Sequence, residues 1–478
     1  MLGSPCKIRK SMKIKNIVTS LLVAILVSCA PAVSVTMIVP TETTTPASTF
    51  TSIPPTSTIT PTPAPENLAD TKDLSKWIDN YVHAFGGKVI VNNVEMNSDQ
   101  LLAEVKSSPD TYVETQQVNG ISYLFFMVNN IPLAFREGNG QWKELTSRKI
   151  IEIFGRPDDV FKYFGVQFSN PFFVNTSSKV DDVFAAEFNA AFLNDAYWHV
   201  VEQKEGFPNF TNSLEAATKA KEAKMFVIGG QLVDPAGEFD YTYLKNKKNL
   251  TRDELLSIMK KHIKMEVEAL GKTVDAFVVV NESRAAAERF FGDPNRAYDQ
   301  FNEIIGEDYI EEAFQTARDT NPNAVLIYNE GFNYHPAFDY TNGSNNTPRT
   351  LEIVSRLKAK GLIDGVGLQM HIRASESPNV DKMIKTFKDY EIPVYVTELE
   401  INLDDVSGTE LEKKQLQEKL FEDVLTAILQ TNVTVMVSHW TAIDDTDGNQ
   451  GQLFDGQLRP TRNLYTERKV LFNYFQNR

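Results

Sequence analysis

Two glutamates in this chain end short apolar segments that are rich in β-branched side chains. Glu282 follows residues 276–281, and Glu398 follows residues 393–397. Such segments are typical of buried parallel strands, whose carboxyl ends gather at one edge of a sheet. Two carboxyl groups there could cleave a glycosidic bond, one protonating the leaving oxygen and the other attacking the sugar or activating water. The alternative for either glutamate is a structural ion pair or a place beside a helix N-terminus.

The elements that would position these glutamates alternate between strand and helix. The expected strands are 161–168, 186–194, 225–233, 276–282, 324–330, 365–371, 393–400 and 433–440. Amphipathic segments lie between most of them, and one begins with a capping box from Thr251 to Glu254. Eight such repeats predict an α/β fold, a (β/α)8 TIM barrel. A doubly wound sheet is the alternative, but no glycine-rich phosphate-binding motif follows any expected strand.

A smaller α/β module is expected before the barrel, at residues 67–150, with the barrel itself at 155–478. Residues 73–85 have the apolar spacing of a helix, and a second helix is expected with Ser98 as its cap. Strand-like segments follow at 112–118, 121–128 and 132–136. Asn119-Gly120 predicts a tight hairpin between the first two. The module either binds a ligand of its own or caps the barrel, and we favour the cap.

The N-terminal residues resemble a bacterial lipoprotein leader. Five basic residues precede an apolar stretch at 17–27, which is too short to span a membrane. The sequence Leu-Val-Ser-Cys ending at Cys29 resembles a lipobox, so we expect a signal peptide at 1–29 and a lipid on Cys29. Ordinary secretory cleavage near Ala30 or Ala32 is the alternative. Residues 30–66 are rich in Thr, Pro and Ser and predict an extended linker, so we expect an extracellular protein that is membrane-anchored or secreted.

Composition limits the class of partner. The chain has 478 residues and a formal net charge of −15, with no cluster of Lys and Arg in its body. That balance argues against nucleic acid as a partner and is compatible with a neutral polysaccharide. No Cys/His cluster has the spacing of metal ligands. We therefore expect a monomer without metal or cofactor, whose only membrane contact is the lipid anchor.

Several segments, in one order along the chain, resemble the motifs of a known enzyme family. Residues 279–282 (Val-Val-Asn-Glu), 365–371 (Gly-Val-Gly-Leu-Gln-Met-His) and 396–400 (Val-Thr-Glu-Leu-Glu) carry most of the similarity. Further matches lie at 306–314, 327–330, 439–444 and 453–460. Together, over about residues 160–478, these segments resemble glycoside hydrolase family 10, the family of endo-1,4-β-xylanases.

The resemblance implies a retaining hydrolase that cleaves plant xylan by double displacement. Glu282 matches the family's general acid/base, and Glu398 matches its nucleophile. We expect the pKa of Glu282 to be raised by burial and by the charge of Glu398. His371 is expected to hydrogen-bond Glu398, and Glu400 to orient His371. The alternative for His371 is a buried structural histidine.

Four residues are expected to bind the substrate. They are Asn281, Asn194, Gln369 and Trp440. Asn281 is expected to reach the sugar 2-hydroxyl, Gln369 to contact Glu282 or the sugar, and Trp440 to stack under a sugar ring. Packing within the barrel is the alternative for Trp440.

The chain departs from the family in the early strands. Residues 193–198 lack the Glu and Lys of the family's Glu-Asn-x-x-Lys motif, and residues 229–235 lack a His and a Trp. Phe277-Val278 replaces Trp-Asp, and the second C-terminal Trp is missing near residues 446–449. In the family these positions build the glycone side of the cleft. The sequence therefore leaves two substrates possible, xylan and another β-glycan. The alternative outside the enzymes is a non-catalytic, polysaccharide-binding lipoprotein.

Overall fold

The computed structural model describes residues 68–168, 178–235, 242–283, 300–331, 347–375, 378, 380–403, 406–443 and 452–478. The predicted signal peptide, Cys29 and the linker lie outside these residues, as do Asp444 and residues 446–449. Ala64–Arg478 form one compact unit. None of the helices in the described ranges is long and apolar enough to cross a membrane.

Eight parallel strands close into a barrel. They are β7 (Tyr163–Phe168), β8 (Ala190–Leu193), β9 (Phe226–Val233), β10 (Ala276–Asn281), β11 (Val325–Gly331), β12 (Gly365–Arg373), β13 (Val394–Asn402) and β14 (Thr434–His439). The ring closes where β14 pairs with β7, with Ser438 opposite Gly165. The (β/α)8 barrel prediction is confirmed, and the doubly wound alternative is wrong because the sheet has no open edge. The strand expected from residue 186 begins only at Ala190, since residues 178–187 form a helix.

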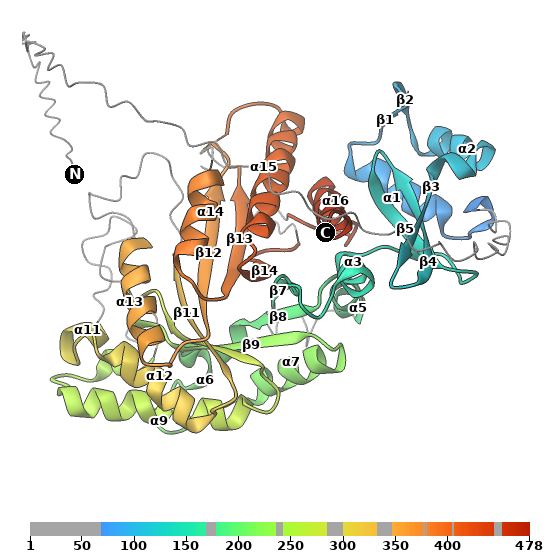
Figure 1. Cartoon of the computed structure of the whole chain (residues 1–478). Helices are drawn as coiled ribbons and strands as arrows, with labels where there is room; N and C mark the ends of the chain where they lie inside the picture. Colours follow the sequence, from blue (N-terminus) through green and yellow to red (C-terminus); the bar gives the residue numbers. More distant parts are fainter. Residues whose placement is uncertain are drawn as a thin grey trace, which may run out of the picture. The chain divides into compact units, whose positions relative to one another are not determined.

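Helices cover the outside of the barrel (Figure 1). They are α5 (Ser178–Glu187), α6 (Trp198–Val201), α7 (Thr211–Glu222), α9 (Arg252–Leu270), α11 (Gln300–Ile304), α12 (Tyr309–Thr320), α13 (Thr347–Ala359), α14 (Val380–Asp389), α15 (Glu410–Gln430) and α16 (Arg462–Gln476). The capping box at the start of α9 is confirmed. The Thr251 side chain accepts from the Glu254 backbone N–H, and the Glu254 side chain accepts from the Thr251 backbone N–H. A short 3₁₀ helix, η3 (Asn194–Ala196), follows β8 directly.

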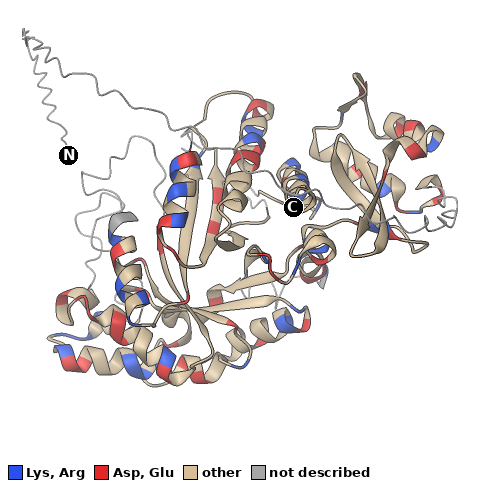
Figure 2. Ribbon diagram, viewed as in Figure 1, with Lys and Arg blue, Asp and Glu red and all other residues tan. Residues whose placement is uncertain are grey.

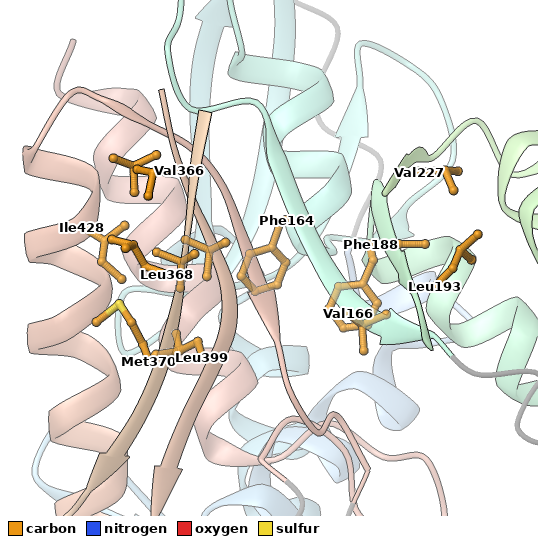
Figure 3. Close-up of a cluster of buried hydrophobic side chains, with 14 of the residues drawn as sticks. Phe164, Val166, Phe188, Leu193, Val227, Val366, Leu368, Met370, Leu399 and Ile428 are labelled. Carbon is orange, nitrogen blue, oxygen red and sulfur yellow. The ribbon is translucent and has the colours of Figure 1, made fainter. Parts of the chain in front are cut away.

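Strand periodicity sorts the side chains of the barrel into two cores. Val366, Leu368 and Met370 of β12 point outward and pack in the same cluster as Ile428 of α15 (Figure 3). Because successive side chains of a strand face opposite sides, the residues between them face the barrel interior. On β12 these include Gln369 and His371. The interior core below them consists of Ala190, Phe192, Ile228, Ala276, Val278, Ile327, Tyr395 and Met436.

The N-terminal module contains a hairpin, a four-stranded sheet and three helices. Its strands are β1 (Val89–Val91), β2 (Val94–Met96), β3 (Val113–Val118), β4 (Ile121–Val128), β5 (Ile131–Glu137) and β6 (Lys143–Glu144). Its helices are α1 (Leu74–Ala84), α2 (Ser98–Ser107) and α3 (Ser147–Phe154). The hairpin at Asn119-Gly120 is confirmed, with φ of 52° and 81°. The prediction that Ser98 caps α2 is wrong: Asn97 has the extended backbone of a cap, and its side chain accepts from the Gln100 N–H.

The module shares its core with the last helix of the barrel. Phe125 of β4 and Phe154 of α3 both contact Phe472 of α16, with ring centroids 5.0 and 5.4 Å apart. Arg468 of α16 is buried and donates to Glu187 of α5 and to Glu144 of β6. A shared aromatic core and a buried ion pair are the contacts that a structural cap requires.

The outer helices carry mixed charge. Both acidic and basic residues lie along α9 and along the N-terminal part of α15 (Figure 2), and many form exposed pairs such as Lys264–Glu268 at 3.8 Å. Pairs of this kind contribute between nothing and about 1 kcal/mol to stability. The charged residues on the outer helices thus form ordinary surface ion pairs.

Candidate active site

Paired strands bring the predicted catalytic residues to one end of the barrel. β12 and β13 run parallel with Gln369 opposite Glu398 and His371 opposite Glu400. Glu282 follows the last residue of β10, where Asn281 lies opposite Asn329 of the neighbouring β11. The apolar, β-branched runs of these strands bury their middles, so the polar side chains emerge together at the carboxyl ends.

Gln369 joins the two predicted catalytic carboxyl groups. Its Nε2 lies 2.8 Å from Glu282 Oε1 and 3.1 Å from Glu398 Oε1. Because one nitrogen contacts both carboxyl groups, the distance between Glu282 Oε1 and Glu398 Oε1 cannot exceed the sum of these two distances. One oxygen of each carboxyl group therefore lies near the other, which is compatible with the roughly 5–5.5 Å between the carboxyl groups of a retaining pair. The spacing fits the direct nucleophilic attack of a retaining pair.

Glu282 has the environment of a general acid. Burial raises the pKa of its carboxyl group and the charge of Glu398 raises it further, while the hydrogen bond from Gln369 acts in the opposite direction. A carboxyl group with a raised pKa keeps its proton nearer neutral pH and can donate it to a leaving oxygen. Its backbone φ of 50° lies in the left-handed region, which L-residues rarely adopt and which is common at functional sites. The Glu282 N–H donates to the Asn329 carbonyl at 3.0 Å and so helps to hold this conformation.

His371 lies between two carboxylates. Its Nε2 is 2.9 Å from Glu398 Oε2, and its Nδ1 is 2.8 Å from Glu400 Oε2. Burial by itself lowers the pKa of the imidazole, but the hydrogen bonds and charges of Glu398 and Glu400 raise it to about 10. His371 is therefore a cation at neutral pH that holds Glu398 in place and balances its charge. Both hydrogen bonds expected from the sequence are present, and the structural-histidine alternative does not describe a side chain that is 42 % exposed.

A buried amide network supports the two catalytic strands. Asn329 Nδ2 donates to Asn281 Oδ1 at 2.9 Å, and Thr397 Oγ1 donates to Asn329 Oδ1 at 2.8 Å. Asn281 also lies 3.4 Å from Gln369 Nε2, so the network reaches the donor that joins the carboxyl groups. A β-carbon on Gly367 would overlap Asn329 Oδ1, so the network needs glycine there. The motif at residues 327–330 was the only sequence signal for Asn329, and it did not indicate this role.

Further polar residues lie beside the catalytic strands, and the sequence did not indicate their contacts. Tyr328 Oη donates to Glu330 Oε2 at 2.9 Å and lies 2.5 Å from the hydroxyl of Ser283, the residue after Glu282. Gln167 of β7 donates to the carbonyl of Thr397 at 3.0 Å, across the strand that separates them. These contacts hold Ser283, which follows Glu282, and Thr397, which precedes Glu398.

The remaining predicted substrate-binding residues lie at the barrel mouth or just below it. The ring of Trp440, half-buried, meets His371 edge to face, with centroids 5.4 Å apart and an interplanar angle of 80°. Asn194 of η3 accepts from Tyr197 Oη at 2.9 Å. Asn281 is buried, its Oδ1 accepts from Asn329, and its side chain also hydrogen-bonds the carboxyl group of Glu282. Within the described ranges, no group of three or more His, Cys, Asp or Glu side chains could hold a metal ion.

The arrangement can carry out a two-step displacement. Glu282, protonated, donates to the leaving oxygen while Glu398 attacks the anomeric carbon and forms an ester. Esterification removes the negative charge of Glu398, and with it the repulsion that raises the pKa of Glu282. Glu282 is then a stronger acid and, once ionised, serves as the base that activates water for the second step.

Comparisons with known proteins agree with this geometry. The profile of glycosyl hydrolase family 10 matches residues 156–470. Endo-1,4-beta-xylanase A of Humicola insolens is 30% identical over 261 residues, which cover 52% of this chain and 63% of that protein. Endo-1,4-beta-xylanase A of Thermotoga neapolitana is 32% identical over 165 residues, covering 33% of this chain and 14% of that protein. The chain thus spans less than two thirds of the length of these curated relatives.

A solved structure shows the same fold. Xylanase 10B from Thermotoga petrophila RKU-1, in complex with xylobiose, superposes with a TM-score of 0.60 at 23% identity, covering 70% of this chain and all of that one (100%). At 23% identity the superposition is evidence for a shared barrel fold. The match to the family profile is the evidence for common ancestry. With a profile that matches most of its length and with this barrel, the chain belongs to glycosyl hydrolase family 10.

Proposed function

We propose that this protein is a retaining endo-1,4-β-xylanase that cleaves plant xylan, with Glu282 as general acid/base and Glu398 as nucleophile. The observation that carries the proposal is the single Gln369 nitrogen within hydrogen-bond distance of both carboxyl groups. A protein that only bound polysaccharide would have no use for two repelling carboxyl groups held this close. The xylan substrate is supported by the relatives, which are named endo-1,4-beta-xylanases.

The first test measures reducing sugar released from xylan by the purified protein and by the variants Glu282→Ala and Glu398→Ala. We expect release by the wild type, and a loss of about 10⁴-fold or more in the Glu398 variant, because no covalent intermediate can form. Glu268→Ala is the matched control, since Glu268 is exposed on α9 and forms a surface ion pair with Lys264. Unchanged release in either catalytic variant would refute the assignment.

A second measurement tests retention. We expect NMR of the first products to show the β-anomer, because two displacements at one carbon restore the configuration. Initial formation of the α-anomer would show inversion and contradict the short spacing of the two carboxyl groups. A folded wild-type protein that releases nothing from xylan would direct attention to other β-glycans, and then to a purely binding function.

We also propose that the protein is a lipoprotein held at the extracellular face by Cys29. Support comes from the basic residues, the short apolar stretch and the lipobox-like sequence that ends at Cys29. Radiolabelled palmitate fed to expressing bacteria should label the wild type and not Cys29→Ala. Equal absence of label, with the wild type found in the medium, would favour ordinary secretory cleavage near Ala30 or Ala32.

A further inference from the structure

A histidine and a glutamate form a buried pair on the outside of the barrel, between β14 and α16. His439 is the last residue of β14, and its Nε2 lies 3.1 Å from Oε1 of Glu467 on α16. Both side chains are fully buried, at 0% exposed. Apart from this contact, neither side chain has a hydrogen-bond partner among the residues that the structure describes. Each of the two groups therefore depends on the other, since a polar group without a partner is costly to bury.

The imidazole of His439 lies among aromatic rings of the outer core. The ring of Phe164 on β7 meets it edge to face with centroids 5.4 Å apart, and the ring of Phe421 on α15 is 5.8 Å away. Both phenylalanines belong to the cluster between the barrel and its helices, so His439 points away from the barrel interior. Because successive side chains of a strand face opposite sides, the next residue, Trp440, faces the interior. One peptide unit thus links the buried pair to the mouth of the barrel.

The backbone at Trp440 is tied to the strand that carries the predicted nucleophile. His439 lies opposite Leu399 of β13, the residue after Glu398, and the Trp440 N–H donates to the Leu399 carbonyl at 3.1 Å. The indole ring meets the ring of His371 with centroids 5.4 Å apart, and His371 lies 2.9 Å from Glu398. A shift of the end of β14 would therefore move the ring on which a sugar is expected to stack.

Glu467 can act as a fixed point because the next residue of α16 is anchored on two sides. Arg468 is buried and donates to Glu187 of α5 and to Glu144 of β6. One turn further along the helix, Phe472 lies in the aromatic core that the barrel shares with the N-terminal module. The module thus holds α16, and α16 presents Glu467 to the end of β14.

We propose that Glu467 is a positioning residue, which through His439 holds Trp440 where a sugar ring stacks. The inference rests on the proposed xylanase function. A close polar contact has a preferred geometry, whereas apolar packing is non-directional, so the pair fixes the strand end more narrowly than the surrounding rings do. Stacking acts on the bound sugar before and during the reaction alike. A displaced Trp440 therefore weakens binding and leaves the chemical step nearly unchanged.

The test compares KM and kcat for a xylo-oligosaccharide in the wild type and in Glu467→Leu, which removes the carboxyl group and keeps the space filled. KM should rise about tenfold while kcat changes by less than about threefold. Glu467→Gln still offers His439 an acceptor and should keep KM within about threefold of the wild type. Lys469→Ala is the matched control, because it removes a partly exposed ion pair between α16 and α15 and should change neither constant.

A double-mutant cycle with Trp440→Ala separates positioning from a merely structural role. Where the ring is already gone, Glu467→Leu should leave KM unchanged within about twofold, although it lowers the thermal unfolding midpoint as much as it does in the wild type. An equal rise in KM with and without Trp440 would overturn the inference, as would an unchanged KM in a folded Glu467→Leu variant. If Glu467→Leu does not fold, its combination with His439→Phe leaves no buried polar group unpaired and takes its place in both measurements.

A measurement without substrate keeps the inference apart from the xylanase proposal. Acrylamide quenching of Trp440 fluorescence is obtained as the difference between proteins with and without Trp440→Phe. Stronger quenching in Glu467→Leu than in the wild type would uphold the positioning role, and equal quenching would refute it. If the wild type hydrolyses no xylo-oligosaccharide, the xylanase proposal fails, and the quenching decides by itself whether Glu467 positions Trp440.

Discussion

The imidazole Nε2 of His371 lies 2.9 Å from Oε2 of Glu398, the predicted nucleophile. The two residues sit on neighbouring parallel strands, and the second ring nitrogen of His371 is held by Glu400. A cation fixed between two carboxylates holds one oxygen of the nucleophile in place and leaves its other oxygen for Gln369 and the substrate. The net charge of the active site therefore depends on whether His371 is protonated, and so on pH.

Stability should fall at alkaline pH through His371. Its pKa is raised from 6.5 to about 10 in the folded protein, because the two carboxylates outweigh the effect of burial. The folded state thus holds the proton more tightly than the unfolded chain, so this stabilisation is complete below pH 6.5 and is lost as pH rises toward 10. Urea unfolding of the wild type and of His371→Gln at several pH values measures it. An identical pH dependence in the two proteins would show that His371 does not titrate in this way.

Gln369→Ala should move the alkaline limb of the pH–activity profile to higher pH. The hydrogen bond from Gln369 lowers the pKa of Glu282, so its removal lets that pKa rise and keeps the acid protonated further into the alkaline range. We also expect kcat to fall about ten- to hundredfold, since the donor that holds both carboxyl groups is gone. The pH profiles of kcat and of kcat/KM on an aryl β-xyloside check both. Gln315→Ala, on the exposed face of α12, serves as control, and a limb that moves to lower pH would contradict the assignment.

Gly367→Ala should damage stability and activity together. The added methyl group overlaps Asn329 Oδ1, and relieving the overlap costs about 1–3 kcal/mol and displaces Asn329 from Asn281 and Thr397. Thermal unfolding and kcat on xylan measure the two effects. Gly120→Ala is the comparison variant: its φ of 81° makes alanine strained, yet it lies in the module hairpin and should leave kcat unchanged. Full activity in Gly367→Ala would mean that the amide network does not position the catalytic strands.

Arg468→Ala should destabilise the protein by about 3–5 kcal/mol, because it leaves the carboxylate of Glu187 buried without its cationic partner. The same change separates Glu144 of the module from α16, so the module and the barrel should lose stability together. Denaturant unfolding followed by tryptophan fluorescence measures this. Lys264→Ala removes only an exposed pair and should change stability by less than about 0.5 kcal/mol. A small effect of Arg468→Ala would show that the module is only loosely attached.

Features that depend on near neighbours in the chain could be predicted. The β-branched runs before Glu282 and Glu398, the Asn119-Gly120 turn and the Thr251 capping box all express local periodicity or local hydrogen bonding, and all are present. Errors occurred where two local signals competed. Ser98 and Asn97 are both good caps, and only the backbone conformation decides that Asn97 takes the role.

The sequence by itself determined that eight strands alternate with helices and that Glu282 and Glu398 follow apolar segments of two of them, since side-chain periodicity depends on residues close together in the chain. Tertiary structure alone decided that Gln369 contacts both Glu282 and Glu398, residues 87 and 29 positions away. Closure of the barrel sets that contact, because it fixes the register between strands that are distant in the chain. The same reason holds for Arg468 and Glu144, which meet across 324 positions and make the module part of the folded barrel unit.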